Sequence, residues 1–126
     1  VRRFAELRRR GVVPAERPFL LYVLGRYTPG QVSTPADLIP FLAAAEDQEL
    51  DWAICAFGRL EGACALTAAA LGGHVRVGFE NNMLLADGAV ALDNAALVRQ
   101  IAGAAGLAGR TVADAATART ILGRSG

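Results

Sequence analysis

Two charged residues, Arg76 and Glu80, interrupt the apolar segment that follows the Gly72-Gly73 pair. A carboxylate at the end of a strand can ligate a metal ion or accept a proton, and an arginine can stabilise a developing negative charge. Burying either charge without a partner costs free energy, so both are candidates for chemistry. Their positions alone leave two structural readings open: a buried ion pair for Arg76 and a solvated loop position for Glu80.

A strand over residues 74–80 would place its side chains alternately on two faces. One face carries a polar set and the other an apolar set: His74, Arg76, Gly78 and Glu80 against Val75, Val77 and Phe79. The apolar face suits packing against helices, and the polar face suits the inside of a barrel. Six residues of strand at ~3.3 Å separate the backbones of His74 and Glu80 by roughly 20 Å, too far for one zinc ion. We therefore expect His74 to make structural hydrogen bonds near the start of the strand.

The surrounding segments alternate between helix and strand patterns. The apolar runs at residues 19–25 and 51–58 have the length and continuity of strands that are buried on both faces. Helices are predicted at residues 2–10, from a Thr34 cap to about Glu49, at 61–71, from Asp93 or Asn94 to about Ala105, and from Asp114 to Leu122. This order predicts an α/β fold with parallel strands joined by right-handed helical crossovers.

The chain length bounds the architecture. With 126 residues, of which 53% are hydrophobic, the chain is long enough for one core. Three parallel strands leave two unpaired edges, whereas a complete (β/α)₈ barrel takes ~250 residues, roughly twice this length. We therefore expect residues 1–126 to be a single partial domain, a part of a barrel. The one methionine is Met83 and the sequence starts at Val1, which favours a segment of a longer protein.

Several function classes receive no support from the sequence. A net charge of +1 gives no argument for nucleic-acid binding, and the arginines at positions 2, 3, 8, 9 and 10 predict a solvated helix face. No apolar run approaches the ~20 residues of a membrane span. The loop at 25–30 has no phosphate-binding spacing. Cys55 and Cys64 form no metal or redox motif, and we expect buried thiols in a reducing cytoplasm.

Residues 71–82 carry a resemblance to a known family. The segment Gly72–Asn82 resembles the last-strand motif of the β-keto acid cleavage enzymes, the family of 3-keto-5-aminohexanoate cleavage enzyme. Val23-Leu24-Gly25 and Thr34-Pro35 are similar to that family's sixth strand and to the helix start after it. Residues 52–59 are similar to its seventh strand, and residues 93–98 to the helix that follows the last-strand motif. The resemblance covers nearly the whole chain and identifies it as the C-terminal portion, about three βα units.

This resemblance implies a zinc-dependent TIM barrel that condenses a β-keto acid with acetyl-CoA and releases acetoacetate and a new acyl-CoA. Glu80 takes the place of a zinc ligand, which the family combines with a His-x-His pair on an early strand. Arg76 takes the place of an arginine that helps to deprotonate the keto acid. The next family position is often aspartate, but here it is Asn81. An amide cannot accept a proton, and arginine is too basic to act as a free base, so Arg76 either has another carboxylate nearby or acts only electrostatically. Three consequences stay open: a weaker activity, the use of another carboxylate, and a different keto acid as substrate.

Gly58 and Arg59 follow the second strand and are candidates for binding substrate or CoA. We expect a complete protein of this kind to form a homo-oligomer. Two alternatives remain open: a half barrel that assembles with another chain, and a non-catalytic α/β module that binds a small acyl or CoA ligand. We expect no catalysis from residues 1–126 alone, because the histidine pair lies outside them.

Overall fold

A small parallel sheet with helical crossovers forms the centre of the molecule. The computed structural model describes residues 1–13, 18–46 and 50–123. The sheet has the order β1 (Phe19–Leu24), β2 (Asp51–Ala56) and β3 (His74–Val75), and all neighbouring strands are parallel. The α/β fold predicted from the apolar runs is therefore confirmed, together with the predicted order of helices and strands.

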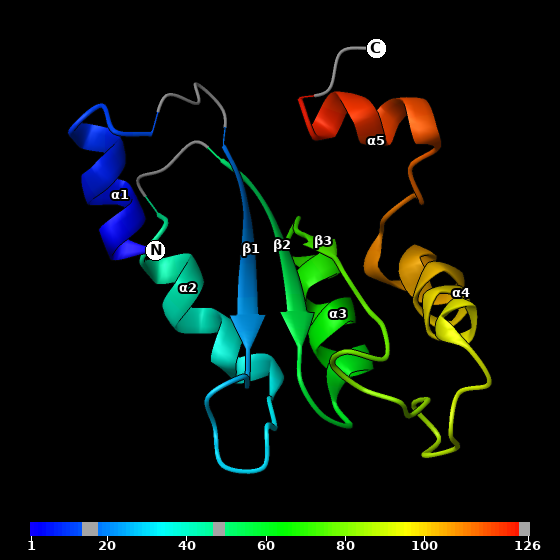
Figure 1. Cartoon of the computed structure of the whole chain (residues 1–126). Helices are drawn as coiled ribbons and strands as arrows, with labels where there is room; N and C mark the ends of the chain where they lie inside the picture. The colour runs from blue at the N-terminus through cyan, green and yellow to red at the C-terminus, as the bar shows by residue number, and fades with distance from the viewer. Residues whose placement is uncertain (14–17, 47–49, 124–126) are drawn as a thin grey trace.

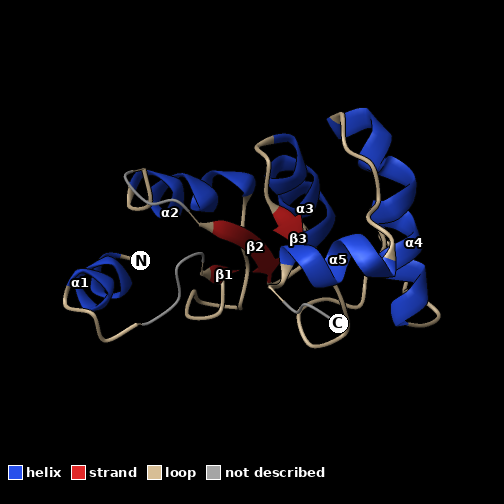
Figure 2. Cartoon of the chain, turned by 90° about the horizontal axis from the view of Figure 1, so that it is seen from above, coloured by secondary structure: helices blue, strands red, loops and turns tan. Residues whose placement is uncertain are grey.

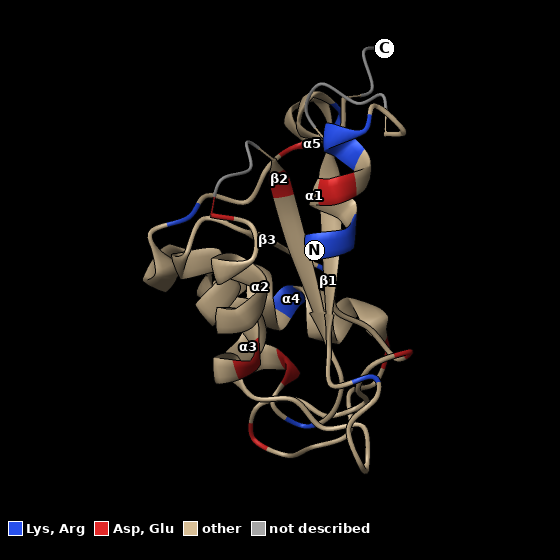
Figure 3. Ribbon diagram, turned by 90° about the vertical axis from the view of Figure 1, so that its left-hand side faces the viewer, with Lys and Arg blue, Asp and Glu red and all other residues tan. Residues whose placement is uncertain are grey.

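The helices surround this sheet unevenly. They are α1 (Arg2–Arg9), α2 (Ile39–Ala43) with the preceding 3₁₀ turn η1 (Pro35–Leu38), α3 (Glu61–Ala70), α4 (Asn94–Ala104) with η2 (Ala105–Ala108), and α5 (Ala115–Ile121). Figures 1 and 2 show α2 and α3 along one face of the sheet, with α4 beyond β3. The arginine-rich α1 has no buried residue, as expected for a solvated helix, and Figure 3 shows the charged positions along its ribbon.

The core lies between the sheet and α2 and α3. Its buried members come from both layers: Tyr22, Leu24, Leu38, Ile54, Ala56, Cys64 and Ala68. On the opposite face of the sheet, Leu21 and Val23 remain 40% and 37% exposed. Burial of β1 on both faces was therefore a wrong prediction for the described residues, because no described element covers that side of the strand.

The third strand is shorter than its sequence predicts. It ends at Val75, although the backbone N–H of Arg76 still donates to Ile54 O at 2.8 Å. Beyond it, side chains accept the hydrogen bonds that a longer strand would give to β2. The N–H of Gly78 donates to Glu61 Oε1 at 3.1 Å, and that of Phe79 donates to Asn94 Oδ1 at 2.8 Å. The predicted strand through Glu80 was wrong from Arg76 onward, and a turn replaces it.

The helix starts follow the sequence more closely. Thr34 is the N-cap residue, as predicted, and its backbone N–H donates to Asp37 Oδ2 at 2.7 Å. Asp93 and Asp114 accept hydrogen bonds from the first turns of α4 and α5, as predicted. The helix predicted to reach about Glu49 instead ends at Ala43, because an i−3 bond from Ala45 N to Leu42 O closes its last turn. Residues 47–49 lie outside the described part of the chain.

None of the helices in the described ranges is long and apolar enough to cross a membrane.

Candidate active site

The carboxyl ends of the three parallel strands lie at one edge of the sheet, and the candidate residues gather in the loops that follow them (Figure 1). This arrangement follows from parallel pairing, since every strand then ends at the same edge. Three segments contribute: the loop after β1, the start of α3 after β2, and the turn after β3. That turn is closed by Gly78, whose carbonyl accepts from the N–H groups of Asn81 and Asn82 at 2.9 and 3.1 Å.

The turn brings Arg76, Glu80 and Asn81 together. Arg76 Nη2 donates to the carboxylate of Glu80 and also to Asn81 Oδ1, at 3.3 Å for the latter. The side chains of Arg76 and Glu80 are 46% and 62% exposed, so solvent or another molecule can reach both. The three residues singled out for catalysis and metal binding therefore form one connected cluster.

A second arginine reaches the same carboxylate. Arg26 lies in the loop after β1, and its Nη1 is 3.9 Å from Glu80 Oε1. Its guanidinium carbon also lies 5.9 Å from the centroid of the Phe57 ring, within the range of a cation–π contact. Sequence reasoning missed Arg26, although its place two residues beyond an apolar strand puts it at the carboxyl edge.

Glu61, the first residue of α3, binds the turn through its side chain. Its side chain is buried, with the residue 2% exposed, and its Oε1 and Oε2 accept from Gly78 N and Asn82 Nδ2 at 3.1 and 3.2 Å. Burial raises the pKa of Glu61 above its ordinary value, while the hydrogen bonds from Gly78 and Asn82 and the charge of Arg76 oppose that shift. This residue was also missed, because an acidic residue in the first turn of a helix is a common feature.

Asn81 accepts hydrogen bonds through both its side chain, from Arg76, and its backbone. Its backbone carbonyl accepts from Gly58 N at 3.0 Å, and the residue is 7% exposed. Its Nδ2 has no hydrogen-bond partner among the described residues. Burial raises the pKa of the nearby Cys55 thiol, and the charge of Arg76 is the largest opposing effect. Cys55 and Cys64 are free and buried, so the expected buried thiols are confirmed.

Of the two candidate ligand-binding residues, Gly58 lies within this cluster and Arg59 is exposed beside it. Gly58 has φ +89°, and a Cβ there would lie 3.1 Å from the carbonyl oxygen of Gln31. Glycine is therefore required where the loops after β1 and β2 meet. The hydrogen bond from Gly58 N to Asn81 O holds the backbone of Gly58 against the turn after β3.

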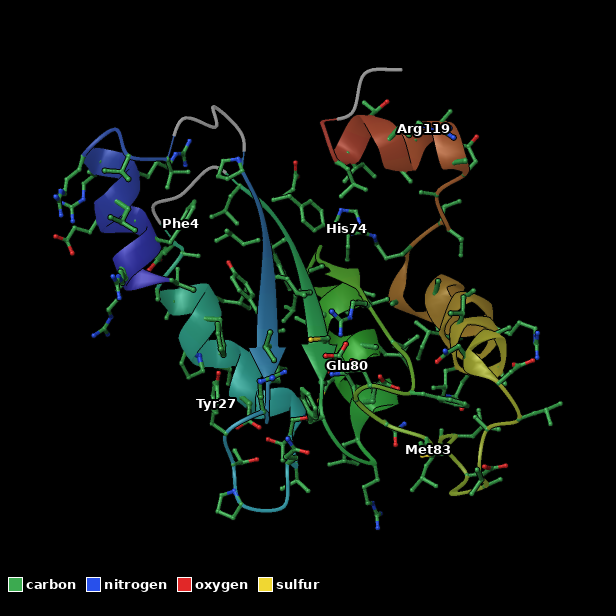
Figure 4. The ribbon with its side chains drawn as sticks, viewed as in Figure 1. Phe4, Tyr27, His74, Glu80, Met83 and Arg119 are labelled. Carbon is green, nitrogen blue, oxygen red and sulfur yellow. The ribbon has the colours of Figure 1, made fainter. Side chains whose placement is uncertain are left out.

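His74 lies at the other end of the sheet. Its ring centroid is 5.7 Å from that of Phe19, the first residue of β1, and Figure 4 shows it well separated from Glu80. The distance between His74 and Glu80 was predicted from an extended strand over residues 74–80, but the strand ends at Val75. Its packing against Phe19 still places it away from the carboxyl edge.

The described residues by themselves do not form a metal site. They contain no group of three or more His, Cys, Asp or Glu side chains that could hold an ion. Glu80 offers one exposed carboxylate between two arginines, which fits the role of a single ligand. Since protein-bound zinc takes three or four protein ligands, the others would have to come from outside these residues.

A separate groove lies elsewhere. It has a volume of about 790 Å³ and runs between β3 and the helices α3, α4 and α5, lined by apolar side chains such as Val75, Ile101 and Val112. Arg76 borders it, but Glu80 and Asn81 do not. The cluster around Glu80 is therefore an open edge of the sheet rather than part of this groove.

Comparison with known proteins identifies the family. The model of the beta-keto acid cleavage enzyme family matches residues 1–123. The chain is 41% identical over 96 residues to a 3-keto-5-aminohexanoate cleavage enzyme of Acetoanaerobium sticklandii, covering 76% of this chain and 35% of that protein. It is 35% identical over 92 residues to a protein of the same name from Fusobacterium nucleatum, covering 73% and 34%.

A third relative carries a different name. The chain is 42% identical over 72 residues to a 3-oxoadipate:acetyl-CoA acetyltransferase of Cupriavidus necator, covering 57% of this chain and 25% of that protein. The chain spans about a third or less of the length of these curated relatives. The family model and the first two relatives agree with the resemblance in residues 71–82, and the chain belongs to the beta-keto acid cleavage enzyme family.

Proposed function

We propose that this chain is the C-terminal portion of a zinc-dependent β-keto acid cleavage enzyme with a TIM barrel fold. The full-length protein would convert a β-keto acid and acetyl-CoA to acetoacetate and a new acyl-CoA. The observation that carries this proposal is the cluster in which Arg76 binds both Glu80 and Asn81, inside the motif that resembles the family's last strand.

Glu80 is the proposed zinc ligand of this portion. Its side chain is 62% exposed at the carboxyl edge, where barrel active sites are built. A bound zinc ion would supply Lewis-acid polarisation of the keto oxygen. The remaining ligands would be the histidine pair that the family resemblance implies, on a strand outside residues 1–126.

Arg76 is proposed to stabilise the negative charge that develops as the keto acid loses a proton. Its hydrogen bonds to Glu80 and Asn81 hold the guanidinium in one orientation before the substrate arrives, which is the condition for effective electrostatic stabilisation. Asn81 orients Arg76 but cannot accept the proton, because an amide has no basic site in this range. The proton therefore passes to another carboxylate of the complete enzyme.

Arg26, Gly58 and Arg59 are proposed to line the approach of the anionic substrates. Both the keto acid and CoA carry negative charges, and guanidinium groups bind carboxylates and phosphates with two parallel hydrogen bonds. Arg26 is already at the cluster, 3.9 Å from Glu80, and Arg59 is exposed next to Gly58.

The exposed apolar face of β1 supports the partial barrel. Leu21 and Val23 point away from the helices and are 40% and 37% exposed, although leucine and valine are among the residues most often buried in folded domains. In a closed barrel this face would be the interior. The same face would suit a half barrel that assembles with a second chain, which is the alternative reading.

The experiment for the whole proposal uses the purified full-length protein. Zinc content is measured by elemental analysis, and acetoacetate formation is followed with acetyl-CoA and a panel of β-keto acids. We expect bound zinc and acetoacetate formation that requires acetyl-CoA. Zinc binding without turnover of any keto acid would contradict the enzymatic function. A stable folded monomer of residues 1–126 would contradict the half-barrel assembly.

A further inference from the structure

The carboxylate of Glu61 joins two segments that are far apart in the sequence. It opens α3, yet both of its oxygens accept hydrogen bonds from the turn after β3, seventeen residues further on to Gly78 and twenty-one to Asn82. Figure 1 shows the start of α3 beside this turn. A carboxylate that is 2% exposed is unusual in a protein interior, since burial disfavours its charge. Its position therefore calls for a reason beyond helix capping.

The two residues that Glu61 holds lie on either side of Glu80 and Asn81. Gly78 is bound through its backbone N–H, and Asn82 is bound through its side-chain amide. Glu61 thus fixes both ends of the turn 78–82, whose middle carries the two side chains that contact Arg76. We propose that Glu61 is a positioning residue, which holds this turn so that Glu80 and Asn81 face Arg76. The inference rests on the proposed function of these three residues.

A carboxylate can accept hydrogen bonds from both Gly78 N and Asn82 Nδ2, whereas an amide can accept only one of them through its oxygen. Glu61 faces two donors, and an ionised carboxylate presents acceptors on both oxygens. In Glu61→Gln, one of the two donors would face the side-chain NH₂ group. Asn82 cannot compensate by reversing its amide, because its Nδ2 donates to Leu84 O at 2.6 Å and its Oδ1 accepts from Leu84 N at 3.0 Å.

The substitution leaves other supports of the turn in place. Asn94 Oδ1 still accepts from Phe79 N at 2.8 Å, and Gly58 N still donates to Asn81 O at 3.0 Å. Glu61→Gln also keeps the size and shape of the buried side chain. We therefore expect a folded protein in which the turn opens more often.

The test uses the full-length protein with Glu61→Gln, and Glu46→Gln as an exposed control. Hydrogen exchange of the peptide that covers residues 78–82 is measured without zinc or substrate. We expect exchange there to accelerate at least about tenfold, which is the factor for about 1.4 kcal/mol of lost local stability. Exchange in β1 and β2 should be unchanged. Zinc affinity should fall about 10- to 100-fold, as for other residues that orient a metal ligand.

Activity gives a second readout. We expect kcat to fall by about 10- to 100-fold, with KM for acetyl-CoA within about twofold, because the turn positions the reacting groups rather than the CoA. If Glu61→Gln does not fold, Asn82→Ala removes one of the two donors from the opposite side and carries the same exchange test. Unchanged exchange at residues 78–82 in the folded variant would overturn the proposal. Accelerated exchange in a protein without cleavage activity would instead support the positioning role and refute the proposed function.

Discussion

The guanidinium of Arg76 donates to the carboxylate of Glu80, and a turn brings the two residues together. In an extended strand, four residues at ~3.3 Å would separate their backbones by roughly 13 Å. The strand stops instead at Val75, because Glu61 and Asn94 accept the N–H groups of Gly78 and Phe79. The contact between Arg76 and Glu80 therefore depends on side chains from two other helices.

Replacing Arg76 tests its electrostatic role. In the full-length protein, we expect Arg76→Gln to lower kcat by about 100-fold or more, since removal of one preorganised donor commonly has this effect. Arg76→Lys should recover only part of the loss, because the shorter lysine side chain places its ammonium group differently from Arg76 Nη2, the nitrogen that contacts both Glu80 and Asn81. Steady-state kinetics with Arg9→Gln, an exposed residue of α1, provides the control. A wild-type kcat in Arg76→Gln would remove this residue from the mechanism.

Asn81 tests the consequence of an amide beside Arg76. Asn81→Asp would keep the hydrogen bond at 3.3 Å from Arg76 and add a charge and a basic oxygen. We expect kcat to rise by about tenfold or more, since a positioned general base typically contributes 10²- to 10⁴-fold. The measurement compares kcat of the two proteins on the same keto acid. No increase in a folded, zinc-loaded variant would mean that this position does not limit proton removal.

Gly73 tests how the start of β3 is positioned. A Cβ at Gly73 would lie 2.3 Å from a ring carbon of Trp52, so alanine there forces the ring or the strand to move. We expect Gly73→Ala to lower the free energy of unfolding by about 1–3 kcal/mol. Gly103→Ala is the matched control, because Gly103 lies in α4 with open space around it. This control should raise the free energy of unfolding by about 0.5–1 kcal/mol. Equal effects from both substitutions in urea unfolding would contradict the close contact.

The lowered pKa of Asp114 should make the stability of the folded protein depend on pH. The hydrogen bond from Thr117 N lowers the pKa of Asp114 below its ordinary value, so the folded protein binds fewer protons there than the unfolded chain. The stabilisation is present above that ordinary value and is lost as the pH falls through the lowered pKa. We expect the difference in stability between wild type and Asp114→Asn to shrink progressively as the pH falls below about 5.

Asp114→Ala controls for the hydrogen bond itself, because alanine cannot cap α5 at any pH. It should be less stable than Asp114→Asn throughout the range. A difference between wild type and Asp114→Asn that stays constant with pH would show that the charge of Asp114 does not act on the folded state.

Local sequence signals predicted much of this fold. The apolar runs predicted β1 and β2. Thr34, Asp93 and Asp114 predicted where three helical segments begin, because capping depends on residues within one turn. The length of β3 was mispredicted because its end is set by Glu61, whose partner Gly78 is seventeen residues away.

The candidate site divides in the same way. Arg76, Glu80 and Asn81 are neighbours in the sequence, so a single motif pointed to all three. Arg26 comes from the loop after β1 and Glu61 from the first turn of α3, and only the packing of the carboxyl edge brings them to the turn. Their residue types carried no local signal, since an arginine in a loop and a glutamate in a first helical turn are common on protein surfaces.

The most direct test of the account is the zinc content and the acetyl-CoA-dependent acetoacetate formation of full-length Glu80→Gln, measured beside wild type and Glu46→Gln. The amide lacks the negative charge that favours zinc binding, so we expect zinc affinity and kcat both to fall by at least about 100-fold. Loss of a residue that only orients a metal ligand typically costs about 10- to 100-fold, and loss of a ligand itself should cost at least as much. Glu46→Gln should match wild type in both. Full zinc occupancy and unchanged acetoacetate formation in Glu80→Gln would contradict the proposal that Glu80 is a zinc ligand of this enzyme.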